Sequence, residues 1–173
     1  MLKKDKKQKN MKIKAKQNKN NFELCPEYTG VAKIVDATEL REYETQYGDK
    51  EQFRFILEVN QKDKNGKYLT VATKPLTPSY HEKASLTKFT QQVLGRPLTQ
   101  AEKDDGFDPE DLIGKYVQII VEHVPSATMT DKFYANITFV GKTKSTDSWK
   151  SEYVRLSEKK AGLEEKKAAE SLQ

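Results

Sequence analysis

The stretch SLTKFTQQVLGRPLT (Ser85–Thr99) predicts a helix with a firm end, in a chain that otherwise favours β-structure. Its apolar side chains recur at the spacing of one helical face. The residues of this face are Leu86, Phe89, Val93 and Leu94. Gly95 and Pro97 follow and stop the helix. The position of this helix between two groups of predicted strands decides the fold.

Helical signals continue after this stretch, so we expect a helical region of three pieces within residues 79–113. The second piece has a capping box, in which Thr99 is the N-cap and Glu102 is its reciprocal partner. The third piece begins with Asp108 as N-cap and Pro109 at the first helical position. The three sets of signals agree with one another in order and spacing.

Three predicted strands precede the helical region. We expect a long first strand at residues 28–44, a second at 53–60 and a third at 68–74, because these segments alternate and are rich in β-formers. Asn65-Gly66 predicts a hairpin turn between the second and the third. The buried face of the second strand is expected to carry Phe53, Phe55, Leu57 and Val59.

Two more predicted strands follow the helical region, at residues 116–124 and 132–141. Successive side chains of a strand point to opposite faces, so every second residue shares a face. The shared apolar face of the first is expected to carry Val117, Ile119 and Val121. That of the second is expected to carry Phe133, Ala135, Ile137 and Phe139, with Tyr134 and Asn136 opposite.

This order of strands and helix is that of the OB-fold, a five-stranded Greek-key barrel. We therefore predict a mainly β protein: a five-stranded OB-fold barrel with a helical insertion between strands 3 and 4. Such barrels bind oligonucleotides through the face of strands 2 and 3 and through two loops, expected here near residues 42–50 and 124–131. An unrelated mixed α+β sheet would give the same order, and the sequence leaves that alternative open.

Charge divides the chain into three parts, at residues 1–21, 22–142 and 143–173. The first part has nine lysines and one aspartate, and its low apolar content predicts a disordered basic arm that is attracted to phosphate backbones. A tail that only aids solubility would have the same composition. The middle part is the expected OB-fold domain and is mildly acidic, and the last part is polar and expected to be partly helical or disordered. The lysines of the arm are Lys3, Lys4, Lys6, Lys7, Lys9, Lys12, Lys14, Lys16 and Lys19.

Four blocks of the sequence are distinctive together: SYHEKASLTKF, LGRPLTQAE, GFDPEDLIGKYVQIIVEH and KFYANITFVG. In this order, within residues 30–141, they resemble a family of small bacteriophage and prophage proteins. The resemblance implies an OB-fold single-stranded DNA-binding protein associated with replication. The chain ends KKAAESLQ, not in the short acidic tip of well-known bacterial single-strand binders, so recruitment of partners through such a tip is not expected.

Residues that would carry catalysis are few. His81 and His123 have no cysteine partners at metal-binding spacing, so we expect no metal and no cofactor. The five carboxylates within residues 104–111 fit helix caps and solvated turns better than a two-metal nuclease site. Cys25 has no base nearby in the sequence, so we do not expect a nucleophile. The sequence predicts a protein that is not an enzyme.

The single cysteine and the lack of a long apolar run predict a cytoplasmic protein that does not enter a membrane. For a phage-encoded protein this would be the host cytoplasm. The basic N-terminus also lacks the apolar stretch of a secretory signal.

Aromatic and basic residues fall where an OB-fold presents its binding face. Single-strand binders need positive charge along the backbone and aromatic rings on which bases stack. The predicted nucleic-acid-binding residues are Tyr43, Tyr47, Lys50, Arg54, Tyr68, Lys74, Lys132 and Tyr134. Tyrosines on strands also commonly just cover a barrel, so a structural role is the alternative at each position. Trp149 and Tyr153 are expected to form a small helical anchor that packs on the barrel, on a second subunit or on nucleic acid.

The leading hypothesis is a non-catalytic, largely sequence-independent single-stranded DNA-binding protein of phage DNA replication or recombination. The alternative is an OB-like module that binds a replication or recombination protein and no nucleic acid itself. Exposed barrel edges and the C-terminal segment would each allow a homo-oligomer, so the oligomeric state stays open.

Overall fold

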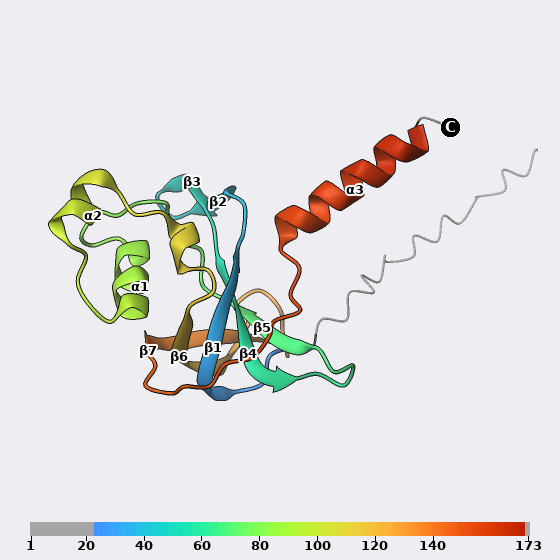
Figure 1. Ribbon diagram of the computed structural model, residues 1–173, viewed down its shortest axis with the longest axis horizontal. Coiled ribbons are helices and arrows are strands. Elements are labelled where there is room, and N and C mark those ends of the chain that lie inside the picture. Colours follow the sequence, from blue (N-terminus) through green and yellow to red (C-terminus); the bar gives the residue numbers. More distant parts are fainter. Residues whose placement is uncertain (1–22, 172–173) are drawn as a thin grey trace, which may run out of the picture.

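The computed structural model describes residues 23–171, so the basic arm predicted at residues 1–21 lies outside the described residues. The described residues form seven strands, three α-helices and one 3-10 helix (Figure 1). The strands are β1 (Tyr28–Ala37), β2 (Arg41–Thr45), β3 (Gly48–Gln52), β4 (Phe55–Lys62), β5 (Tyr68–Ala72), β6 (Tyr116–Pro125) and β7 (Phe133–Lys142). The helices are α1 (Ser85–Leu94), α2 (Gln100–Asp105), η1 (Pro109–Leu112) and α3 (Leu156–Ser171). None of these helices is long and apolar enough to span a membrane.

Five strands form an antiparallel sheet in the order β5-β4-β1-β6-β7, which confirms the prediction of a mainly β protein. β1 lies at the centre, with Ile34 opposite Leu57 of β4 and Ala32 opposite Val117 of β6. The edge strands β5 and β7 come close to each other. No hydrogen-bonded pairing joins them within the described residues, so the sheet is not a closed barrel.

One face of the sheet builds the core together with α1. The alternating apolar residues of β4 are buried, as predicted, and they meet the buried apolar face of α1. The rings of Phe55 and Phe89 stack with their centroids 4.9 Å apart. Full burial of such a side chain contributes about 1.5–3 kcal/mol. Gly95 ends α1 with a φ of +68°, a left-handed conformation that favours glycine, so the predicted helix and its stop are confirmed.

The two shorter helical pieces have the caps that the sequence predicts. The Thr99 hydroxyl accepts a hydrogen bond from the Glu102 N–H, and the Glu102 carboxylate accepts one from the Thr99 N–H. Arg96 lies 2.7 Å from the same carboxylate, and these hydrogen bonds lower the pKa of Glu102 to about 2. Asp108 caps the third piece, which is a single 3-10 turn.

The long first strand predicted at residues 28–44 is wrong, because two separate strands form there. The Thr38 N–H donates to the Arg54 carbonyl at 2.8 Å, and the Arg54 N–H donates to the Thr38 hydroxyl at 2.8 Å. This contact closes the neck of an inserted hairpin, in which β2 and β3 pair as a sheet of their own. The first binding loop, expected at residues 42–50, is therefore a β-hairpin.

The single apolar face predicted for β7 is right only in part, because Ala135 and Ile137 pack against the core but Phe133 and Phe139 do not. The pairing with β6 shifts between Ile120 and Val121, because Thr138 is an extra residue on β7. This bulge reverses the alternation, so Val140 is buried and Phe139 is 47% exposed. Phe133 is 57% exposed for another reason, since it pairs with Pro125 at the tip of the hairpin, beyond the core.

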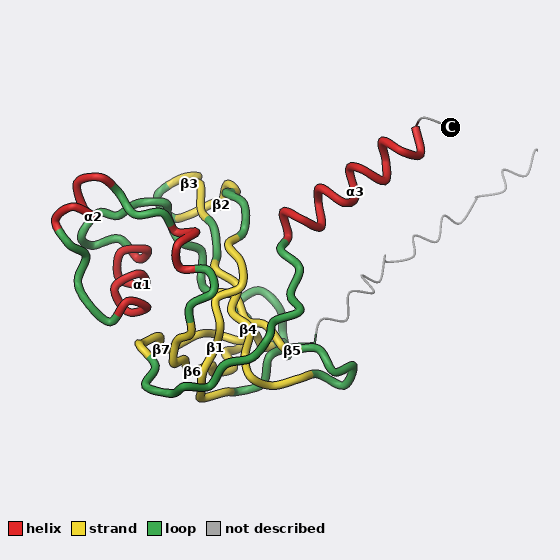
Figure 2. Tube along the Cα trace, viewed as in Figure 1, coloured by secondary structure: helices red, strands yellow, loops and turns green. Residues whose placement is uncertain are grey.

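Residues 143–155, between β7 and α3, cross the outer face of the sheet, and we call this segment the strap (Figure 2). Four alternate side chains of the strap bond to the body of the protein, which shows that the segment is extended. They are Trp149, Ser151, Tyr153 and Arg155. The predicted helical anchor of Trp149 and Tyr153 is therefore wrong in conformation, although both residues do pack on the sheet. α3 follows and projects away from the sheet (Figure 1).

The strap covers two buried carboxylates that stand on the outer face of the sheet. Glu58 is 2% exposed and accepts hydrogen bonds from the Trp149 indole and the Ser151 hydroxyl. Asp36 is 1% exposed and accepts from Tyr153, from Arg155 and from the backbone of Leu156.

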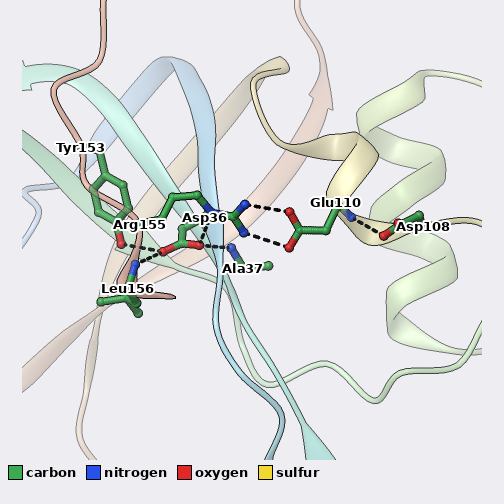
Figure 3. A network of polar contacts seen from close by, with 7 residues as sticks. All are labelled: Asp36, Ala37, Asp108, Glu110, Tyr153, Arg155 and Leu156. Carbon is green, nitrogen blue, oxygen red and sulfur yellow. Dashed lines mark hydrogen bonds and ion pairs between the residues drawn. The ribbon is translucent and has the colours of Figure 1, made fainter. Parts of the chain in front are cut away.

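The Arg155 guanidinium lies between Asp36 and Glu110, as Figure 3 shows. Its hydrogen bonds to Glu110 and then to Asp36 raise its pKa above the usual value. Arg155 therefore joins β1, η1 and the strap through one charged group.

Candidate nucleic-acid interface

A hollow lies between the unpaired edges of β5 and β7, and we call it the seam hollow. Its volume is about 630 Å³. It is lined by residues 70–75 on the β5 side, by residues 134–136 on the β7 side, and by Arg54 and residues 23–25. Because β5 and β7 are not joined by hydrogen bonds within the described residues, their edges stay apart and the hollow lies between them.

Three of the predicted binding residues meet in the seam hollow: Arg54, Lys74 and Tyr134. Lys74 is exposed, and the Tyr134 side chain is 45% exposed. Arg54 comes from the segment before β4, where its guanidinium lies 5.9 Å from the centroid of the Tyr43 ring. Two cations and an aromatic ring from separate segments thus share one surface, although Glu23 adds a negative charge there.

Asn136 belongs to the same surface and was not among the predicted binding residues. It pairs with Glu122 of β6, two residues along β7 from Tyr134, so the two side chains share the outer face of the strand. The alternation of the segment already predicted this position. An amide beside an aromatic ring supplies a hydrogen-bond donor and an acceptor next to a stacking surface.

Other predicted residues lie outside the seam hollow. Tyr47 and Lys50 are on the β2–β3 hairpin, where the Lys50 ammonium lies 5.4 Å from the centroid of the Tyr47 ring. Tyr47 is 78% exposed. Lys132 is exposed at the tip of the β6–β7 hairpin, where its carbonyl accepts a hydrogen bond from Ser126. The structure therefore places these cations on two hairpins and not in one groove.

Tyr68 has a different environment from the other predicted tyrosines. Its ring is half-buried, with the Trp149 ring at a centroid distance of 5.7 Å and the Lys62 ammonium at 4.9 Å. Both contacts occupy the π-system that would stack a base. In this arrangement Tyr68 supports the strap, and no local signal in the sequence predicted this contact, because Trp149 is distant in the chain.

The N-terminal end of the described chain is held at the seam hollow by Cys25. This residue is 2% exposed, and burial raises the pKa of its thiol to about 11, so the thiol stays protonated at neutral pH. The Cys25 carbonyl accepts a hydrogen bond from His123 Nε2 at 2.7 Å. The described part of the chain therefore begins beside the hollow.

Histidines and carboxylates form no group of three that would hold a metal ion in the part of the chain that the structure describes. His81 shapes the turn before α1, since its Nδ1 accepts from the Lys83 N–H and its carbonyl accepts from the Thr87 hydroxyl. His123 is engaged with Cys25 and Glu27.

Neither the models of known protein families nor the curated proteins match this chain. Evidence on its function therefore comes from the geometry of the described residues.

Proposed function

We propose that this protein binds single-stranded DNA, without catalysis and largely without sequence preference. The observation that carries the proposal is the seam hollow, where Arg54, Lys74 and Tyr134 line one surface between two strand edges. We further propose that the sheet is an OB-fold whose β5–β7 seam is open. Two features support this fold: five antiparallel strands with the helices between the third and fourth of them, and a barrel type that is itself only partly closed.

In the proposed complex the sugar-phosphate backbone of the single-stranded DNA runs through the seam hollow. The Arg54 guanidinium and the Lys74 ammonium contact phosphates, and the Tyr134 ring stacks a base. Stacking on an aromatic side chain contributes about 1–3 kcal/mol per base and is sequence-tolerant, because every base has a π-face. The phosphate contacts are equally indifferent to sequence.

The lysine-rich arm is expected to add attraction to phosphates, because the described chain begins beside the hollow. Each phosphate contact made by a lysine releases counterions, so affinity would fall steeply with salt. The two hairpins would contact the DNA where it leaves the hollow, through Tyr47 and Lys50 on β2–β3 and through Lys132 on β6–β7.

The test is fluorescence anisotropy with labelled oligo-dT, oligo-rU and duplex DNA at low and moderate salt. We expect the full-length protein to bind oligo-dT more tightly than duplex, and Tyr134→Ala to weaken this binding about fivefold or more. Lys74→Ala is expected to weaken it and to lower the salt dependence, while Lys103→Ala, on α2, is the matched control. If full-length protein binds no single strand, the proposal is wrong. If deleting residues 1–21 abolishes binding and the Tyr134 and Lys74 variants change nothing, only the arm binds DNA.

A protein-binding module is the second candidate, and the tip of the β6–β7 hairpin favours it. Met129 and Phe133 are 55% and 57% exposed on this one hairpin, and exposed apolar side chains that gather on a surface mark sites of protein contact. A role in phage replication or recombination, as the family resemblance implies, would suit either candidate. Binding of single strands by the described body distinguishes the first candidate from the second.

A further inference from the structure

A second hollow adjoins the seam hollow, between α1 and β7, and we call it the helix hollow. Its volume is about 370 Å³. Thr73, Lys74 and Pro75 line both hollows. The two hollows together therefore form one groove along β7. Lys74 therefore lies where the two hollows meet.

The solvent-facing side of α1 forms one wall of the helix hollow. Ser85, Lys88 and Gln92 lie on this wall, at positions i, i+3 and i+7, opposite the face that is buried in the core. Lys88 and Lys74 are the charged residues in the lining, and no carboxylate lines the helix hollow among the described residues. The wall therefore presents positive charge and polar groups to whatever occupies the space.

Phe139 lines the helix hollow on its β7 side and is the aromatic residue that the β7 bulge turns outward. Its side chain is 47% exposed. The tip of its ring lies over Gly141, so closely that a Cβ on Gly141 would be 2.8 Å from the ring. The absence of a side chain at Gly141 thus lets the ring lie against the strand.

We propose that the helix hollow is a second nucleotide subsite, in which Phe139 stacks a base and Lys88 and Lys74 contact neighbouring phosphates. This inference rests on the proposed function, because it extends the same groove. Tyr134 and Phe139 are five residues apart on β7, which is roughly 17 Å at about 3.4 Å per residue. A dinucleotide reaches only one of the two rings, whereas a longer strand of DNA spans both.

The test compares labelled oligo-dT of about two and about twelve nucleotides, and the longer one lies within the range of OB-fold site sizes. We expect Phe139→Ala to weaken binding of the longer oligonucleotide about fivefold or more. Phe139→Tyr keeps a π-face and should bind as the wild type does. Phe133→Ala is the matched control, because Phe133 is an exposed phenylalanine of the same strand that lines neither hollow.

Lys88→Ala tests the phosphate contact separately. Loss of one contact should lower the slope of log affinity against log salt by about 0.7 for the longer oligonucleotide. Lys103→Ala, another exposed helical lysine, should leave this slope unchanged. Unchanged circular dichroism and melting temperature would show that each variant is folded.

The results separate this inference from the proposed function. If the wild type binds neither oligonucleotide, the proposed function fails and the subsite fails with it. If Tyr134→Ala weakens binding while Phe139→Ala and Lys88→Ala behave like their controls, the function stands and the subsite is overturned. Equal affinity of the wild type for the short and the longer oligonucleotide would also overturn it.

Discussion

The indole nitrogen of Trp149 donates a hydrogen bond of 2.6 Å to Oε1 of Glu58, across 91 positions of the chain. Trp149 is the single tryptophan of the protein, and its ring packs edge-on against Tyr116 at a centroid distance of 5.2 Å. The carboxylate under it stands on the face of β4 that points away from the core. The strap therefore supplies both the cover and the donors that this buried charge requires.

Trp149→Phe keeps an aromatic ring but removes the N–H that Glu58 accepts. We expect the free energy of unfolding to fall by about 1–3 kcal/mol, since a buried acceptor loses a partner. Urea unfolding followed by circular dichroism measures this change. Lys150→Ala, which alters an exposed neighbour, should stay within about 0.5 kcal/mol of the wild type. A cost that is just as large in the Glu58→Ala background, which lacks the acceptor, would argue against the hydrogen bond as its cause.

Arg155→Leu removes the cation that neutralises Asp36, and we expect it to cost about 2–4 kcal/mol. The Asp36 carboxylate would remain buried with three neutral donors and no positive charge beside it. Lys160→Ala breaks a pair with Glu39 in which both side chains are more than half exposed, so it should cost at most about 1 kcal/mol. Equal melting temperatures for the two variants would contradict this account of Arg155.

Alkaline pH is expected to release the strap. Burial, with help from the charge of Asp36 and the hydrogen bond to it, raises the pKa of Tyr153 from 10.0 to about 12. Because the folded protein holds this proton more tightly than the unfolded chain, the contribution to stability is complete below pH 10 and is lost as the pH rises to about 12. Trp149 fluorescence should follow the release. In Tyr153→Phe this group no longer titrates, so a transition of unchanged amplitude and midpoint would show that other groups cause it.

Gly141→Ala should displace the Phe139 ring, because the new Cβ would overlap it. We expect weaker binding of the longer oligonucleotide with little change in melting temperature, since both residues lie on the outer side of β7. In the Phe139→Ala background the same substitution should have no further effect on affinity. Additive losses in the double variant would mean that Gly141 acts by some other route.

Local signals in the sequence were sufficient for α1, for the Thr99–Glu102 capping box and for the buried face of β4. Each of these depends on residues only a few positions apart, which a periodic pattern records. The outward position of Phe139 depends on the pairing of β7 with β6, and the extra residue at Thr138 leaves no trace in the composition. Reading the strand with an unbroken period of two therefore placed Phe139 on the wrong face.

The candidate site was predicted in part for the same reason. Alternation placed Lys74 and Tyr134 on the outer faces of their strands, and the structure brings both to the seam hollow. It did not predict that Tyr68 would be covered, because Trp149 comes from far along the chain. The position of Lys88 and Gln92 beside the helix hollow was also not predicted. The helical period shows which face of α1 is buried, but not what lies next to its exposed face.

The strap also determines which parts of the protein unfold together. Its donors satisfy carboxylates of β1 and β4, so the strap cannot leave without exposing two buried charges at the centre of the sheet. Sheet and strap should therefore exchange their amide hydrogens as one cooperative unit. α3, which projects into solvent beyond Leu156, has few such ties and can open and reform on its own, so its amides should exchange long before those of β1.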